Sequence, residues 1–308
     1  MSRAVVFAYH NVGVRCLKVL LAQGIDVALI FTHDDNPAEN IWFDGVAALA
    51  ADYGIPFITP DDPNTPELLQ QIRDLKPDFL FSFYYRKMLS PELLAIAPKG
   101  ALNMHGSLLP KYRGRVPVNW AIIHGETETG ATLHYMIEKP DAGNIVSQTV
   151  VPILPDDTAG EVFNKVTLAA ELTLHRVLPS LIAGNAPRIV QDLSQGSYFS
   201  GRKPEDGRID WSWPAQQIHN LVRAVAPPYP GAFTTVNGQP ARVLRSRMIE
   251  LNMQTRLAPK LELIDGHLIA HCAGGGLLQI LALDIAGASV IPAQLADLIG
   301  SGPWQLGD

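Results

Sequence analysis

The sequence predicts an α/β protein, with a doubly wound, mostly parallel sheet over residues 1–200 and a smaller β-rich domain over residues 201–308. Three observations predict this fold class. Short apolar runs, typical of strands buried on both faces, alternate with helical stretches through the first 200 residues. From about residue 200 onwards, short strands and glycines dominate. The 308 residues, 47% of them hydrophobic, suffice for one large domain or two moderate ones with a sizeable core.

The elements of the first domain follow each other in βαβ order. We expect strands at residues 5–8, 27–31, 55–58, 79–83, 101–105, 131–136 and 145–151. We expect helices at residues 14–21, 46–53, 66–75, 91–96 and 117–124, and a long helix from about 158 towards 182. Pro56 places the third strand near an edge of the sheet, because proline cannot donate to a ladder. Gly13 is expected in a tight turn, which lacks the G-x-G-x-x-G pattern of a dinucleotide site.

The second domain is expected to open with a loop that feeds a strand at residues 209–211. A helix at residues 214–226 carries its apolar side chains on one side, and the proline-rich stretch that follows it forms a rigid turn. Further strands are expected at residues 233–236, 241–244, 261–264, 268–271 and 277–281.

Composition argues against several classes of protein. The formal net charge of -6, without any run of like charges, argues against a nucleic-acid binder. No stretch approaches the roughly 20 apolar residues of a membrane span, and the first apolar run is too short for a signal peptide. Cys16 and Cys272 lie far apart and in no C-x-x-C pair. We therefore expect two reduced thiols in a cytoplasmic protein, and no metal site.

The candidate site begins with Asn103 and His105. The two residues stand two apart on an expected strand, so their side chains point to the same face. They lie at the carboxyl end of that strand, which is where ligands bind in doubly wound sheets. The loop of residues 84–89 follows the preceding strand and is expected at the same edge.

Asp141 follows a later strand, in a proline-glycine loop from which it could approach Asn103 and His105. A carboxylate orients an imidazole and stabilises its cationic form, and an amide donor can stabilise an oxyanion. Such a set suits acyl transfer to a nucleophile that the substrate supplies, since Ser107 lacks a G-x-S-x-G elbow. On these residues alone, a structural hydrogen-bonded pair and a turn role for Asp141 are the commoner alternatives. The arginines of the next loop could bind an anion or form a solvated turn.

Short motifs along both domains add a family resemblance. They are residues 103–110 (Asn-Met-His-Gly-Ser-Leu-Leu-Pro), 113–117, 141–143, 209–211, 223–224 and 229–233. The chain resembles formyltransferases that use 10-formyltetrahydrofolate, over nearly its whole length and most weakly after about residue 240. The resemblance implies a Rossmann-like catalytic domain, an OB-like C-terminal domain and an N-formyltransferase with 10-formyltetrahydrofolate as co-substrate.

Further segments narrow the resemblance to one group. They are residues 5–10, 31–33, 35–37, 81–86, 119–120, 125–130 and 202–206. These segments are similar to the formyltransferase domain of the bifunctional polymyxin-resistance enzyme, which formylates UDP-4-amino-4-deoxy-L-arabinose for lipid A modification. That enzyme continues into an NAD-dependent decarboxylating half. The sequence stops at Asp308 and has no dinucleotide motif for such a half, so a free-standing formyltransferase is expected here. The transfer-RNA enzyme typically has Gly-Thr-Pro where this chain has Ala8-Tyr9-His10.

The resemblance implies Asn103, His105 and Asp141 as catalytic residues and a UDP-amino sugar as partner, with no nucleic acid and no membrane insertion. It leaves a homo-oligomer open. Folate is expected against Lys87, Met88, Leu89, Arg115, Ile137, Glu138, Lys139 and Pro140. Within that set, Met88 and Leu89 would supply an apolar slot for the pterin. The open alternatives are methionyl-tRNA formyltransferase, a formyltransferase for another nucleotide-linked amino sugar, and a non-catalytic binding module.

Overall fold

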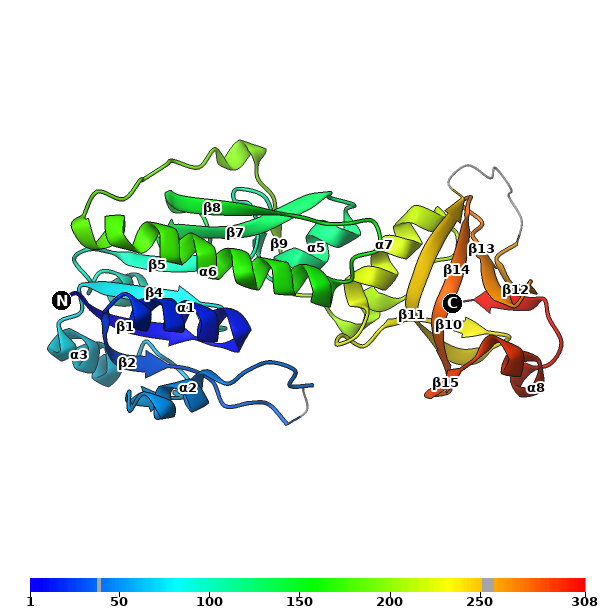
Figure 1. The fold of residues 1–308 in the computed structure, drawn as a ribbon, viewed down its shortest axis with the longest axis horizontal. Helices are drawn as coiled ribbons and strands as arrows, with labels where there is room; N and C mark the ends of the chain where they lie inside the picture. Colours follow the sequence, from blue (N-terminus) through cyan, green and yellow to red (C-terminus); the bar gives the residue numbers. More distant parts are fainter. Residues whose placement is uncertain (38–39, 251–257, 308) are drawn as a thin grey trace. The chain divides into compact units, whose positions relative to one another are not determined.

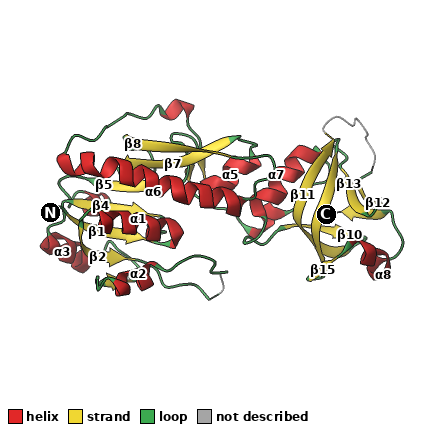
Figure 2. Cartoon of the chain, viewed as in Figure 1, coloured by secondary structure: helices red, strands yellow, loops and turns green. Residues whose placement is uncertain are grey.

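The structure, a computed structural model, describes residues 1–37, 40–250 and 258–307. The chain forms two compact units, and each is described by itself. Unit 1 comprises Met1–Pro117, Glu128–Val151 and Asn164–Ser200, and unit 2 comprises Val118–Thr127, Pro152–Phe163 and Gly201–Asp308. Helices and strands alternate through unit 1, whereas strands dominate unit 2 (Figure 2).

A seven-stranded sheet forms the centre of unit 1, in the order β3-β2-β1-β4-β5-β7-β8. Its strands are β1 (Arg3–Ala8), β2 (Asp26–Phe31), β3 (Phe57–Ile58), β4 (Phe79–Phe83), β5 (Ala101–His105), β7 (Glu128–Tyr135) and β8 (Ile145–Pro152). Strands β1 to β5 pair in parallel, and β7 pairs with β5 in the antiparallel direction. The predicted mostly parallel sheet is therefore confirmed, with β3 at its edge.

Helices cover both faces of this sheet (Figure 1). Helices α1 (His10–Ala22) and α6 (Ala159–Ala183) lie side by side, joined by hydrogen bonds of 2.5 and 2.8 Å from the Arg15 guanidinium to the Glu171 carboxylate. On the other face, α3 (Pro66–Leu75) and α4 (Pro91–Leu94) bury apolar side chains against the strands. That core cluster includes Leu69, Ile72, Leu93, Val5, Phe7, Leu29, Phe31, Leu80, Leu89 and Ala101. Helix α2 (Val46–Asp52) follows β2 in the chain.

Helix α6 has the length that the sequence predicted, but it is more apolar than expected, because no segment was expected to resemble a membrane span. Among the described residues it is the one helix whose length and hydropathy would allow a membrane crossing. Half of its apolar window is buried inside the protein, as in a core helix. Its start agrees with the sequence, because Thr158 and Glu161 exchange the hydrogen bonds of a capping box.

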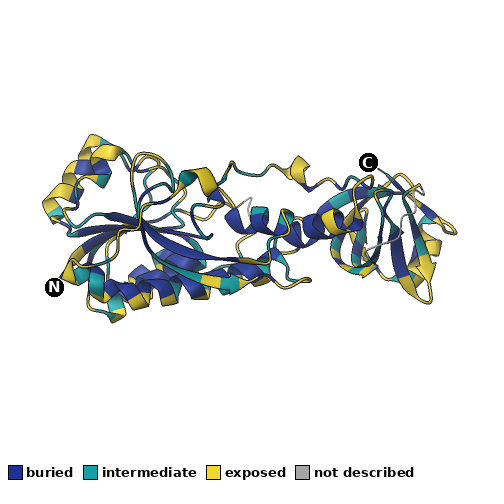
Figure 3. Cartoon of the chain, turned by 90° about the horizontal axis from the view of Figure 1, so that it is seen from above, coloured by how far each residue is buried: buried dark blue, intermediate teal, exposed yellow. Residues whose placement is uncertain are grey.

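Unit 2 holds an antiparallel barrel. The sheet order is β11-β10-β16-β12-β13-β14-β15, and the extra pairing of β11 with β14 closes six of these strands into a ring. The strands are β10 (Ala232–Val236), β11 (Gln239–Glu250), β12 (Lys260–Ile264), β13 (His267–His271), β14 (Leu277–Ile285), β15 (Ala288–Val290) and β16 (Trp304–Gly307). Many residues of these strands are buried (Figure 3), and they form one core cluster with residues of α7 (Ala215–Val225). The predicted β-rich C-terminal domain is confirmed.

Some elements differ from the sequence expectations. Gly13 lies inside α1 rather than in a turn, where a Cβ would come within 3.2 Å of Ala8 on β1. Residues 209–211 form no strand, and the pairing nearby is an isolated bridge between Arg208 and Phe233. Strand β11 runs well beyond residue 244. The short elements β15, β16 and α8 (Leu295–Ile299) were not expected, because three to five residues are too few to show a periodicity.

Candidate active site

Strand β5 carries Asn103 and His105 at the carboxyl edge of the unit 1 sheet. The register places Asn103 opposite Ser82 of β4 on one side and opposite His134 of β7 on the other. Asn103 is half-buried, and His105 is 6% exposed. Both side chains therefore lie where little water reaches them, and charge–charge interactions there are stronger than at the surface.

Asp141 completes the cluster from the loop after β7. Its Oδ1 atom lies 3.5 Å from Nδ1 of His105, 3.5 Å from Nε2 of His134 and 3.4 Å from Nδ2 of Asn103. Its backbone is left-handed, with φ of 52°, a conformation that costs free energy in a residue with a Cβ. The structure thus brings the three predicted residues together. It adds His134, a buried residue that the antiparallel register with Asn103 could have identified.

The second carboxylate oxygen of Asp141 accepts a hydrogen bond of 2.9 Å from the backbone N–H of Gly114. Gly114 belongs to β6 (Arg113–Gly114), which pairs with β9 (Tyr198–Phe199). Its φ is 95°, and a Cβ there would lie 2.1 Å from the carbonyl oxygen of Phe199. Only glycine satisfies both conditions, so this position of the loop is fixed by its contact with β9.

Asp141 is held in its charged form. Burial by itself raises the pKa of this carboxyl group. The facing ring of His105, the ring of His134 and the N–H of Gly114 outweigh burial and hold the pKa of Asp141 well below its usual range. The site therefore keeps a carboxylate next to two imidazoles, with 14% of the Asp141 side chain exposed.

Hydrogen bonds fix the orientation of the His134 ring and of the Asn103 amide. Nδ1 of His134 donates to the carbonyl of Tyr135 (2.8 Å), so Nε2 is the ring atom that faces Asn103 and Asp141. The Asn103 amide directs one N–H to that Nε2 (3.2 Å) and the other to Oδ1 of Asp141 (3.4 Å). The second contact is long, so a substrate oxygen can replace Asp141 as its acceptor at small cost.

The loop of residues 106–115 orients His105 from the other side. Nε2 of His105 donates to the carbonyl of Tyr112 at 2.7 Å, so Nδ1 is the ring atom that faces Asp141. Tyr112 is left-handed, with φ of 56°, and its N–H donates to Oγ of Ser197 at 2.8 Å. The cluster therefore combines an amide donor, an oriented imidazole and a charged carboxylate. Such a set can stabilise an oxyanion and carry a proton.

The residues predicted to bind folate lie in different surroundings. Leu89 packs in the hydrophobic core, and Met88 is 63% exposed. Nζ of Lys87 donates to the carbonyl of Pro60 at 2.5 Å and lies 3.8 Å from the carboxylate of Asp61. Four other residues predicted to bind folate lie exposed or half-buried on the loops that flank Asp141: Arg115, Glu138, Lys139 and Pro140.

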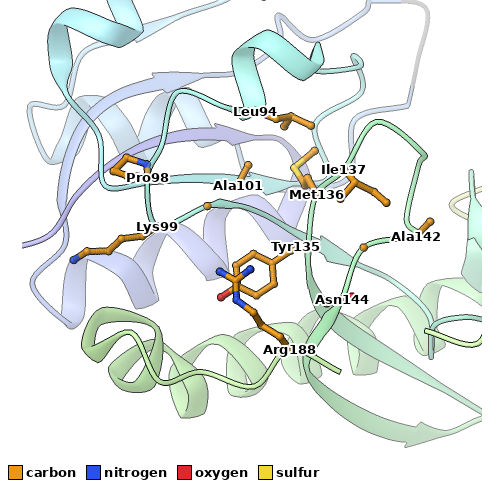
Figure 4. Close-up of a pocket in the computed structure, with 12 residues that line it drawn as sticks. Leu94, Pro98, Lys99, Ala101, Tyr135, Met136, Ile137, Ala142, Asn144 and Arg188 are labelled. Atoms are coloured by element: carbon orange, nitrogen blue, oxygen red, sulfur yellow. The ribbon is translucent and has the colours of Figure 1, made fainter. Parts of the chain in front are cut away.

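A pocket of about 350 Å³ lies against the loop that carries Asp141 (Figure 4). Ile137 lines it, as do the apolar side chains of Leu94, Ala101 and Met136. Lys99, Tyr135 and Arg188 form the opposite side in Figure 4, where the Arg188 guanidinium lies 3.9 Å from the centre of the Tyr135 ring. The volume is within the range of small-molecule sites, about 300–1,000 Å³. Of the predicted folate residues, Ile137 is the one that lines this pocket.

Other residues that could react have structural surroundings. Cys16 and Cys272 are free and buried, and burial raises the pKa of both thiols, that of Cys272 to about 12. Within residues 1–37, 40–250 and 258–307, no group of three or more His, Cys, Asp or Glu is placed to hold a metal ion. The Asp141 cluster is therefore the site with the clearest chemistry in the described structure.

Comparison with known protein families gives two matches. The family model described as formyl transferase matches residues 8–178, and the one described as formyl transferase, C-terminal domain, matches residues 202–296. The first match alone covers more than half of the 308 residues and contains the whole Asp141 cluster.

Solved structures with the same fold include three formyltransferases. An N-formyltransferase from Helicobacter canadensis, in complex with folinic acid and dTDP-3-aminofucose, has 20% identity and a TM-score of 0.72, covering 91% of this chain and 99% of that one. WlaRD, a sugar 3N-formyl transferase solved with dTDP and 5-N-formyl-THF, has 19% identity and a TM-score of 0.70, with coverage of 93% and 98%. A 4-N formyltransferase from Francisella tularensis has 20% identity and a TM-score of 0.64, with coverage of 82% and 98%.

At these identities the structural similarity shows a shared fold, and the family matches carry the assignment. The N-terminal match places Asn103, His105 and Asp141 inside a formyl transferase domain. The C-terminal match covers most of the barrel unit. The chain belongs to the formyl transferase family and is an enzyme of formyl-group transfer.

Proposed function

We propose that this enzyme transfers a formyl group from 10-formyltetrahydrofolate to the 4-amine of a UDP-amino sugar, with UDP-4-amino-4-deoxy-L-arabinose as the first candidate. The observation that carries the proposal is the buried, ionised Asp141 facing His105 and Asn103 within 3.5 Å. Two of the similar structures were solved with folinic acid or 5-N-formyl-THF and with dTDP or a dTDP-sugar. The choice of UDP and of the 4-amine rests on the sequence resemblance.

In this reaction the neutral sugar amine attacks the formyl carbon. A C–N bond forms, and the formyl oxygen becomes an oxyanion. The N–H of Asn103 that points towards Asp141 across 3.4 Å turns to this oxygen, and the imidazolium form of His105 adds a positive charge. Asp141 supports that imidazolium from 3.5 Å.

The second half of the reaction moves one proton. The attacking amine gives a proton to the Asp141 carboxylate, and the bond from the formyl carbon to N10 of the folate breaks. The His105 imidazolium gives its Nδ1 proton to N10 and regains one from Asp141, so tetrahydrofolate and the formamide leave with no net change in charge. The Tyr112 carbonyl occupies Nε2 of His105 and leaves Nδ1 for this exchange.

For folate we propose the contacts that the sequence resemblance implies: Lys87, Met88, Leu89, Arg115 and residues 137–140. The loop of residues 84–89 follows β4, and Arg115 follows Gly114, whose N–H donates to the Asp141 carboxylate. Both therefore lie towards the carboxyl edge of the sheet that carries His105. The pocket of about 350 Å³ is lined by Gly100 and Ala101 at the start of β5, the end of that strand opposite to His105, so we do not assign it to the pterin.

The proposal is tested by incubating the protein with 10-formyltetrahydrofolate and a panel of acceptors, with products identified by mass. The panel contains UDP-4-amino-4-deoxy-L-arabinose, dTDP-linked 3-amino and 4-amino sugars, and initiator methionyl-tRNA. We expect kcat/KM for the UDP sugar to exceed that for the dTDP sugars by at least ~10-fold. Formylation of a dTDP sugar alone would contradict the UDP assignment. Formylation of the transfer RNA alone would contradict the sugar assignment altogether.

A further inference from the structure

Gln191 grips the loop that carries Asp141. This glutamine lies in the segment after α6 and is 9% exposed. Its Nε2 atom donates to the carbonyl of Asp141 at 3.0 Å and to the carbonyl of Gly143 at 2.6 Å. The backbone near Gln191 is itself fixed, because Ile189 exchanges hydrogen bonds of 2.8 and 2.9 Å with Ile145 of β8. One anchored side chain thus holds the loop on both sides of Ala142.

The loop needs such a support. Asp141 is left-handed, which a residue with a Cβ adopts stably only when surrounding contacts impose it. The turn bond inside the loop, from the N–H of Ala142 to the carbonyl of Lys139, is long at 3.4 Å. The two bonds from Gln191 are shorter and fall directly on Asp141 and its neighbour Gly143. They therefore contribute to the backbone conformation that aims the Asp141 carboxylate at the two imidazoles.

The amide of Gln191 can take one orientation in this place. Turning it over would set Oε1 against two carbonyl oxygens, so Nε2 must face the loop. In that orientation Oε1 is buried and finds no hydrogen-bond partner among the residues that the structure describes. A buried unpartnered oxygen costs stability, so an apolar side chain of similar shape would serve packing alone at least as well.

We propose that Gln191 is a positioning residue, whose side-chain amide holds the carbonyls of Asp141 and Gly143 so that the Asp141 carboxylate faces His105 and His134. The inference rests on the role of Asp141 in the formyl transfer proposed above. It assigns a function to the segment after α6, which contributes no group to the reacting atoms. It also links that segment to the pocket, because Gly143 lines the pocket as well.

The test compares Gln191→Met with wild type and with a matched control. Methionine keeps the shape of the side chain and removes both the donor and the unpartnered oxygen. The control is Gln23→Met, since Gln23 also donates to a backbone carbonyl, that of His175, at 2.8 Å. Helix α1 starts at the carboxyl edge of the sheet, the edge that carries His105, and runs towards the opposite edge. Gln23 follows the last residue of α1 and therefore lies towards that opposite edge.

We expect Gln191→Met to lower kcat by ~10–100-fold, because a displacement of about 1 Å at a reacting group has effects of this size. KM for the amino sugar should stay within ~3-fold. The melting temperature should fall, because the carbonyls of Asp141 and Gly143 lose a donor, so kcat is taken per folded molecule. Gln23→Met should keep the wild-type kcat. Gln191→Asn, whose shorter side chain cannot reach both carbonyls, should follow Gln191→Met and serves as the second variant if methionine prevents folding. An unchanged kcat in a folded Gln191 variant would overturn the proposal.

A measurement without substrate separates this inference from the proposed function. The imidazole ¹⁵N signals of His105 and His134 report the carboxylate that faces them. We expect both signals to move in Gln191→Met and to stay in place in Gln23→Met. If wild type formylates no acceptor and the signals still move in Gln191→Met, the proposed function is overturned, but the positioning of Asp141 by Gln191 is supported. Signals that stay in place in Gln191→Met overturn the grip whether or not the enzyme is active.

Discussion

Each unit of the protein buries a polar cluster that contains a histidine, and the two clusters use their hydrogen bonds differently. In unit 1, the Asp141 carboxylate, 14% exposed, faces the His105 ring across 3.5 Å. In unit 2, His219 is 2% exposed and contacts Oγ of Ser246 (2.9 Å) and the carbonyl of Pro155 (3.0 Å). A carboxylate lies near His219 as well, that of Asp156 at 3.5 Å from Nε2, but its side chain is 53% exposed to water.

Arg223, in the same helix as His219, also makes its hydrogen bonds to groups of the protein itself. Arg223 is 6% exposed and donates to Oδ1 of Asn220 at 2.9 and 3.1 Å. It also donates to the carbonyls of Leu154 (3.4 Å) and Asp157 (3.3 Å). These acceptors are a side chain of the same helix and two backbone carbonyls of another segment. The hydrogen bonds of Arg223 therefore join segments of unit 2 together. Burial of polar groups alone does not identify an active site. The unit 1 cluster differs in that its carboxylate is itself buried and faces two imidazoles, whereas the Asp156 carboxylate near His219 is 53% exposed.

The largest effect should come from Asp141→Asn, which keeps the shape of the side chain and removes its charge. We expect kcat to fall by ~10³–10⁴-fold, since the imidazolium of His105 loses its partner and the proton loses its acceptor. Steady-state formyl transfer measures the loss, and circular dichroism checks the fold. A kcat within ~10-fold of wild type would show that the unit 1 cluster, like the unit 2 cluster, has a structural and not a catalytic role.

Asn103→Ala should have the next largest effect. Removing one oxyanion donor of this kind lowers kcat by ~10²–10³-fold. Asn220→Ala is the matched variant in unit 2: it removes the acceptor of Arg223 and should lower the free energy of unfolding instead, with kcat of the folded enzyme kept. Formyl-transfer rates and urea titrations on both variants give the comparison. Equal effects of the two substitutions on kcat would erase the distinction between the clusters.

Much of the unit 1 site could be predicted from local sequence. Asn103 and His105 share a face because they are two apart on a short apolar strand, and β5 forms at the expected residues. The βαβ alternation put their strand end at the edge where ligands bind. The loop after β7 made Asp141 a candidate, and the family resemblance joined it to the pair. These inferences require only the positions of the strands and their order along the chain. They do not require knowledge of how side chains pack.

The supporting residues could not be predicted in the same way. His134 meets Asn103 because β7 runs antiparallel to β5, and strand pairing is not visible in one segment of sequence. Gln191 lies about fifty residues beyond Asp141 in an irregular segment without periodicity, so no local pattern points to their contact. The core position of the Leu89 side chain was not foreseen either, because an apolar residue near a site can equally well face the core.

Arg223→Met should affect stability and leave the chemistry intact. The substitution removes one buried donor from Oδ1 of Asn220 and from two backbone carbonyls, which lowers the free energy of unfolding by about 2–4 kcal/mol. Urea titration measures this, and kcat per folded molecule should stay within ~3-fold. Arg245→Met, at an exposed position on β11, is the control and should change stability by no more than about 0.5 kcal/mol. A large loss of kcat in folded Arg223→Met would give unit 2 a part in the reaction.

The smallest effect concerns the order in which acid weakens the two clusters. Burial, opposed by the carbonyl of Pro155, lowers the pKa of His219, so below its ordinary value of about 6.5 the unfolded chain binds the proton more tightly. Stability from this group is present at neutral pH and is lost as the pH falls through that value. Asp141, whose pKa is lowered too, contributes above the ordinary carboxyl value of about 3.9 and loses its contribution only below it.

Urea titrations from pH 7 to pH 3 on wild type, His219→Gln and Asp141→Asn separate these two contributions. The stability of His219→Gln should fall less than that of wild type between pH 7 and pH 5. The difference between wild type and Asp141→Asn should stay constant over that interval and shrink only towards pH 3, because the protonated carboxyl no longer differs in charge from the amide. A difference that already shrinks above pH 5 would show that Asp141 takes up its proton near neutrality. The carboxylate of unit 1 would then lack the low pKa that its imidazole partners impose.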